Sequence, residues 1–139
     1  MKQGLWLCGL LVWSSLSWAT DHLGHGNAYL QKRVFFSQDK QTLIAVDSRR
    51  SRNIEFRLRV REQVIAVREG QVSIAVATDQ RLFGFSVRAG GWKPVRLELR
   101  EQLIRLQVSD FSIFAETTQR ILTFNGLTGK WFVRRKSTR

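Results

Sequence analysis

The chain repeats itself with a period of about 39 residues, and this repeat constrains the fold more than any other feature. Residues 58–96 align with residues 97–135 without a gap, and 14 of the 39 aligned pairs are identical. The identical pairs include Arg61-Glu62-Gln63 with Arg100-Glu101-Gln102, Ser73-Ile74 with Ser112-Ile113, Gln80-Arg81 with Gln119-Arg120, and Gly90 and Trp92 with Gly129 and Trp131. A unit of this length cannot bury its apolar surface alone, so we expect successive copies to stack.

A shorter, degenerate copy is predicted in residues 34–57, from the segments Phe35-Phe36, Leu43–Asp47 and Ile54–Phe56. It lacks the Gly-x-Trp element, as terminal repeats are often atypical. The predicted division of the chain is a signal peptide (1–19), an N-terminal segment (20–33) and one repeat domain (34–139), which ends in a basic tail (136–139).

Short runs of β-branched, aromatic and alternating residues separated by turn residues predict an all-β fold with four strands in each repeat. In the first complete copy the expected strands are Val64–Val67, Val72–Ala77, Leu82–Val87 and Val95–Arg100. The single proline, Pro94, lies where a strand begins, and its missing N–H matters least there.

The segment Thr128-Gly129-Lys130-Trp131 resembles the Thr-Gly-Lys and Trp signature of the quinoprotein-type β-propeller blade. The resemblance implies propeller-like repeats in which Trp92 and Trp131 dock one blade on the next. Known propellers have at least four blades, so the repeats form a ring completed by several chains, an open stack, or a small β-sandwich or barrel. A two-fold dimer of three blades would close a six-bladed ring.

The N-terminus predicts export. Lys2 precedes an apolar run from Leu5 to Trp13, and Ser17 and Ala19 provide the small residues of a signal-peptidase site. We expect cleavage near Ala19 and a periplasmic or secreted protein. The only cysteine, Cys8, would be removed, so no disulfide is expected.

No catalytic, cofactor-binding or metal-binding residue is assigned from the sequence, and we expect a protein that is not an enzyme. Glu62 and Glu101 recur at one repeat position, which predicts a structural role such as pairing with Arg61, with Arg100 or with a neighbouring blade. If cleavage follows Ala19, the new terminus Thr20-Asp21-His22 has the nitrogen set that suits copper(II); chance placement of the histidine is the alternative reading.

A formal net charge of +12 attracts anions. Arg57, Arg59 and Arg61 alternate with Phe56, Leu58 and Val60, which predicts a strand with a basic stripe on one face; a merely solvated face is the alternative. The basic segments Arg49-Arg50, Arg52, Arg134–Lys136 and Arg139 extend the stripe if they share its surface.

These features favour an exported binding or scaffold protein whose partner is an anionic polysaccharide, lipid headgroups or an acidic protein. Homo-oligomerisation is possible, and export argues against intracellular nucleic acid as the partner. One alternative is a lectin-like oligomer in which Trp92 and Trp131 stack on sugar rings, and exposure of the two rings discriminates it from the docking role. Another is an accessory protein of a periplasmic metal or redox system.

Overall fold

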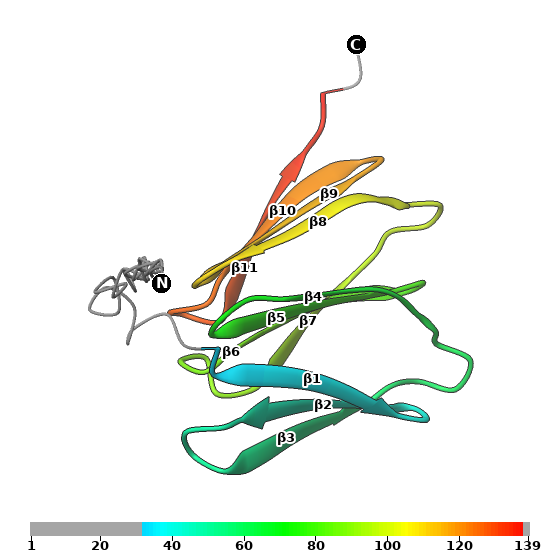
Figure 1. Ribbon diagram of the computed structural model, residues 1–139. Helices are drawn as coiled ribbons and strands as arrows, with labels where there is room; N and C mark the ends of the chain where they lie inside the picture. The colour runs from blue at the N-terminus through cyan, green and yellow to red at the C-terminus, as the bar shows by residue number, and fades with distance from the viewer. Residues whose placement is uncertain (1–31, 138–139) are drawn as a thin grey trace, which may run out of the picture.

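The structure, a computed structural model, describes residues 32–137 and confirms the all-β prediction (Figure 1). The strands are β1 (Val34–Asp39), β2 (Thr42–Asp47), β3 (Arg52–Arg57), β4 (Val64–Glu69), β5 (Ser73–Thr78), β6 (Arg81–Ser86), β7 (Trp92–Arg96), β8 (Leu103–Ser109), β9 (Ser112–Thr117), β10 (Arg120–Asn125) and β11 (Lys130–Arg135). Within these residues there is no helix, and so none that is long and apolar enough to cross a membrane.

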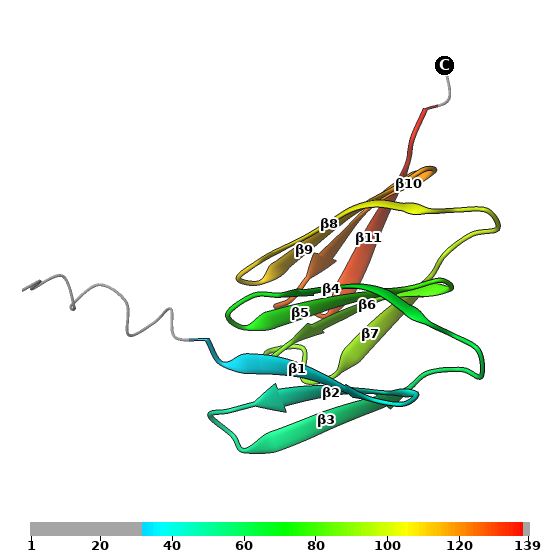
Figure 2. The ribbon, with the colours of Figure 1, turned by 45° about the vertical axis from the view of Figure 1, so that its right-hand side comes forward.

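The strands form three antiparallel sheets that stack face to face in chain order (Figures 1 and 2). Sheet 1 consists of β1–β3, sheet 2 of β4–β7 and sheet 3 of β8–β11, and in each sheet every strand pairs with the next along the chain. Three stacked open sheets are neither the small sandwich nor the barrel considered as alternatives.

The stack reproduces the sequence repeat strand by strand. β8 begins one repeat length after β4, and both strands carry a β-bulge at the same position, between Val64 and Ala66 and between Leu103 and Arg105. β1 begins one repeat length before β5, at Val34, so the three strands of sheet 1 correspond to the last three strands of sheet 2. The equivalent of β4 would fall at residues 25–30, outside the described residues.

One predicted strand is displaced. Alternation predicted a strand over Val95–Arg100, but β7 spans Trp92–Arg96. The chain then leaves the sheet at Leu97, whose N–H donates to the carbonyl of Gln80, and turns toward sheet 3. The alternating pattern belongs to a linker between sheets, which local periodicity cannot distinguish from a strand.

Apolar side chains fill both junctions between the sheets. The first core cluster joins sheets 1 and 2, and its largest members include Leu43, Ile74, Phe83, Phe85 and Trp92. The second cluster joins sheets 2 and 3 and includes Leu82, Leu106, Ile113, Leu122 and Phe124. Sheet 2 lies between the two clusters, and its strands β5 and β6 are buried at every position.

The tryptophans dock each sheet on the one before it, as predicted. The Nε1–H of Trp92 donates to the carbonyl of Ile54 in sheet 1 at 3.0 Å, and that of Trp131 donates to the carbonyl of Lys93 in sheet 2 at 2.7 Å. We call the tryptophan side of a sheet its head face and the opposite side its tail face. Each internal junction therefore joins a head face to the tail face of the preceding sheet.

Gly84 on the tail face of sheet 2 makes room for Phe124 of sheet 3. A Cβ at Gly84 would lie 2.7 Å from Cγ of Phe124, well inside van der Waals contact. The ring of Phe124 is fully buried, so it has little freedom to move away.

We therefore expect Gly84→Ala to destabilise the fold by about 1–3 kcal/mol through overpacking. Urea denaturation measures the change in the free energy of unfolding. Gly91→Ala is the matched control, because a Cβ there meets no atom within 4 Å. Equal stability of the two variants would contradict the close packing of sheets 2 and 3 at Gly84.

Candidate functional site

The candidate site lies at the end of the stack where the chain crosses from sheet to sheet, which we call the linker end (Figures 1 and 2). Two linkers, residues 58–63 and 97–102, cross here. The backbone N–H of Leu58 donates to the carbonyl of Gln41 at 2.6 Å, and that of Leu97 donates to the carbonyl of Gln80 at 2.9 Å. Both leucines are buried, so each linker is anchored where it begins.

A glutamate closes each linker into a tight turn. In the first linker, the N–H of Glu62 donates to the carbonyl of Arg59 at 3.1 Å, and the Arg59 N–H donates to Oε2 of Glu62 at 3.0 Å. Glu98 and Glu101 make the same two bonds in the second linker. The third residue of each turn, Arg61 or Arg100, has a positive φ of 67° or 61°.

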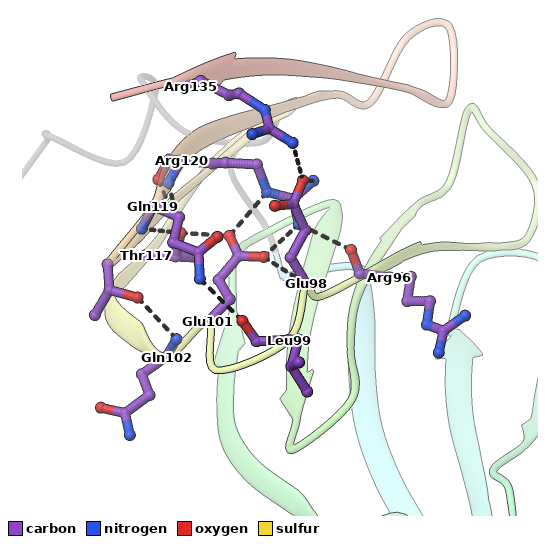
Figure 3. A network of polar contacts seen from close by, with 10 residues as sticks. Arg96, Glu98, Leu99, Glu101, Gln102, Thr117, Gln119, Arg120 and Arg135 are labelled. Carbon is purple, nitrogen blue, oxygen red and sulfur yellow. Dashed lines mark hydrogen bonds and ion pairs between the residues drawn. The ribbon is translucent and has the colours of Figure 1, made fainter. Parts of the chain in front are cut away.

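The carboxylate of each turn glutamate is buried in an ion pair with an arginine of the sheet that follows the linker. Glu62, 1% exposed, accepts two hydrogen bonds from the guanidinium of Arg81 and one from the hydroxyl of Thr78 at 2.7 Å. Glu101 makes the same set with Arg120 and Thr117 (Figure 3). The structural role predicted for the two glutamates is thus confirmed, but their predicted pairing with Arg61, Arg100 or a neighbouring sheet is wrong.

The buried ion pair changes the acidity of its glutamate. Burial alone raises the pKa of Glu62, but hydrogen bonds from Arg81, the Arg59 N–H and Thr78, together with the charge of Arg81, outweigh it and lower the pKa to about 2. The same balance lowers the pKa of Glu101 below its usual range. Both carboxylates are therefore ionised at neutral pH and act as fixed acceptors rather than as proton donors.

Further bonds tie the second linker to sheet 3. A third guanidinium N–H of Arg120 donates to the carbonyl of Arg96, the last residue of β7, at 2.9 Å, and Arg135 donates to Glu98 at 2.9 Å (Figure 3). A hollow of about 720 Å³ opens beside this network, lined by Asp79, Gln80 and residues 96–102. Within residues 32–137 no group of histidine, cysteine, aspartate and glutamate side chains could hold a metal ion.

The turns present an apolar residue next to a cation at the linker end. Val60 and Leu99 are each 87% exposed, and Arg61 and Arg100 follow them. Among the described residues neither arginine has an ion-pair partner. Ile65 and Ile104, at the bulges of β4 and β8, are also exposed and also recur at the repeat spacing.

The arginine stripe predicted from alternation is not a strand face. β3 ends at Arg57, and Arg59 and Arg61 lie in the linker. Val60, expected to face the core, points into solvent instead. The cause is the turn closed by Glu62, which reverses the chain before a strand can continue.

Sequence reasoning missed the arginines and threonines that hold the turns. The signal was available, because Thr78 and Arg81 are identical to Thr117 and Arg120 at the repeat spacing. The predicted signal peptide, Cys8 and His22 lie outside the described residues, as do His25, the second N-terminal histidine, and Arg139.

Comparisons with known proteins show no family for this chain. No protein-family model matches it, and no curated protein matches it. A solved chain from an S. cerevisiae assembly, described as a Dbp5 variant bound to Nup159, a Gle1 variant, IP6 and ADP, is similar at 10% identity with a TM-score of 0.41. The match covers 76% of this chain and 31% of that chain, so this chain spans about a third of its length. A likeness at this level carries no information on function.

The buried pair predicts an acid-sensitive fold. Because the folded pKa of Glu62 is about 2, below its ordinary value of 4.5, the pair stabilises the fold above pH 4.5 and loses this effect as pH falls toward 2. We expect Glu62→Gln to cost about 3 kcal/mol at pH 7. The difference from wild type should shrink steadily between pH 4.5 and 2 in urea titrations.

Asp110→Asn serves as the control, since Asp110 is exposed in the turn between β8 and β9 and makes no ion pair among the described residues. A stability difference for Glu62→Gln that stays constant down to pH 2 would show that the charge of Glu62 is not what stabilises the turn.

Proposed function

We propose that the protein is an exported, non-catalytic binding protein whose linker end engages an anionic component of the cell envelope. The observation that carries the proposal is the repeated turn tip, in which an exposed apolar side chain stands beside an arginine without a carboxylate partner in the described residues. Export is supported by the order of charged, apolar and small residues over positions 1–19.

The backbone at the tips supports a functional reading of the arginines. A positive φ costs a non-glycine residue about 1–2 kcal/mol, and glycine would occupy the position without strain. Both linkers nevertheless place an arginine there, at Arg61 and Arg100. The buried ion pairs of Glu62 and Glu101 stabilise the turns against this strain, so the cations are held in place rather than on loose loops.

Among anionic components, the apolar tips favour a lipid surface. A side chain such as Leu99, 87% exposed in water, gains by entering the headgroup region while Arg100 pairs with lipid phosphate. An anionic polysaccharide would use the arginines and leave Val60 and Leu99 in water. Lipid headgroups are therefore the partner that would contact both the apolar side chain and the arginine of each tip.

The lectin-like alternative has less support. It needs Trp92 and Trp131 to offer ring faces to a sugar, but Trp92 is 6% exposed and its ring packs edge-on against Phe36 of sheet 1. The metal or redox alternative depends on the N-terminal histidines His22 and His25, which lie outside the described residues, and on the quinoprotein-like segment Thr128-Gly129-Lys130-Trp131.

Binding to vesicles that contain anionic lipid tests the proposal. We expect Arg61→Asn/Arg100→Asn to bind about tenfold or more weakly, because each cation near an anionic surface contributes about 1 kcal/mol. Asparagine tolerates positive φ, so the turns should persist. The control Arg49→Asn/Arg88→Asn removes the same charge from exposed turns at the opposite end of the strands and should bind nearly as wild type.

A second pair of variants separates lipid from polymer. Val60→Thr/Leu99→Gln should weaken binding to anionic vesicles while leaving binding to an anionic polysaccharide unchanged. Raising salt from about 0.05 to 0.5 M should weaken wild-type binding at least tenfold. Equal binding of the two double arginine variants would refute a role for the linker end.

A further inference from the structure

The stack ends in two sheet faces that no other described sheet covers, although the ammonium of Lys32 lies over the ring of Phe35 on one of them. The free head face of sheet 1 carries Phe35, Ile44, Val46, Asn53 and Glu55. The free tail face of sheet 3 carries Phe114, Ile121, Thr123, Phe132 and Arg134. Phe35 is 43% exposed and Phe132 is 59% exposed, so each face leaves apolar surface in water.

We propose that these two faces bind each other in a second copy of the chain, so that two copies close a ring of six sheets. The internal junctions already join a head face to a tail face, and the proposed junction would be a third instance of the same contact. The residue pairs at the proposed junction follow from the 39-residue repeat. Each tail-face residue of sheet 3 lies one repeat length after its equivalent in sheet 2, and each head-face residue of sheet 1 lies one repeat length before its equivalent in sheet 2.

The tryptophan position gives the first pairing. Trp92 lies on Ile54 and Trp131 lies on Lys93 in the internal junctions. Asn53 is the repeat equivalent of Trp92, and Phe132 is the repeat equivalent of Lys93. At the proposed junction Asn53 of one copy would therefore lie on Phe132 of the other. The head face has lost a large ring at this position, and the tail face has gained one.

A second position shows the same compensation. Phe124 lies against Gly84 in the second junction, and Phe85 shares the first core cluster with Ala45. The equivalent pair at the proposed junction is Val46 and Thr123. A smaller head residue again meets a larger tail residue, which preserves volume across the contact.

The terminal faces are complementary in charge at one position. Two residues along the outer strand from the tryptophan position, the same register sets Pro94 opposite Phe56 and Val133 opposite Val95, and all four residues are apolar. The equivalent pair at the proposed junction is Glu55 and Arg134, both exposed. Opposite charges at this one position favour the head-to-tail contact and fix its register.

The geometry of the stack favours closure over an endless filament. At the second junction β8 approaches β4 and β5 more closely than β11 approaches β7, so sheets 2 and 3 diverge toward their outer strands, as the sheets of a ring do. A head-to-tail contact closes into a ring when its rotation allows and otherwise extends indefinitely. Closed rings of sheets are known with about four to eight members, and two copies supply six.

Sedimentation of the purified full chain at micromolar concentration tests the proposal. We expect the mass of two chains. Phe35→Glu and Phe132→Glu each damage one face and should each give monomers, whereas an equimolar mixture should regain dimers through its one intact head and one intact tail. Leu127→Glu is the matched control, because Leu127 is 56% exposed in a turn on neither face and should leave the dimer intact.

A charge exchange tests the register. Arg134→Glu and Glu55→Arg should each weaken dimerisation by tenfold or more, and the double variant should restore it. Both residues are exposed in the single chain, so the variants should fold, which circular dichroism can check.

A wild-type monomer would overturn the proposal and would point to residues 1–31 or a different protein as the cover of the free faces. Dimers of Phe132→Glu alone would show a symmetric head-to-head contact instead. Masses that grow beyond two chains with concentration would show an open filament.

Discussion

The burial of sheet faces against neighbouring sheets is the constraint on which this structure depends. In sheet 2 the strands β5 and β6 are buried at every position, whereas β2 and β9 in the flanking sheets alternate buried with partly exposed residues. No sheet has a core of its own, since both core clusters lie between sheets. Stability in such a stack comes from nearest-neighbour interfaces, as in other repeat proteins.

Sequence reasoning predicted what is encoded locally or by repetition. Alternation and turn residues predicted most strands, and the repeated Gly-x-Trp element predicted the docking of Trp92 and Trp131. It failed at the linkers, because alternation over Val95–Arg100 looks like a strand until Glu101 is seen to close a turn. The partner of Glu101, Arg120, lies 19 residues away, beyond the reach of any local pattern.

The buried glutamate clusters explain how the linkers keep their shape. Ion pairs of this kind often contribute little net stability, because desolvation offsets the attraction, but they fix one arrangement of the groups that satisfy them. Here Glu62 and Glu101 each bind a turn N–H, an arginine and a threonine at once. A turn held in this way can tolerate an arginine at positive φ, and an observed backbone outlier of this kind is a sound starting point for a functional hypothesis.

The proposed ring and the proposed binding end reinforce each other through geometry. In a head-to-tail ring, equivalent strands of every sheet run in the same direction relative to the ring axis. All linkers therefore lie on one side of the ring. Two copies would then present two copies each of the Val60 and Leu99 tips toward the same surface. Weak tips that bind together gain affinity through effective concentration without any new contact. The basic charge of a single chain would thus become a planar binding surface only once the free head and tail faces are paired.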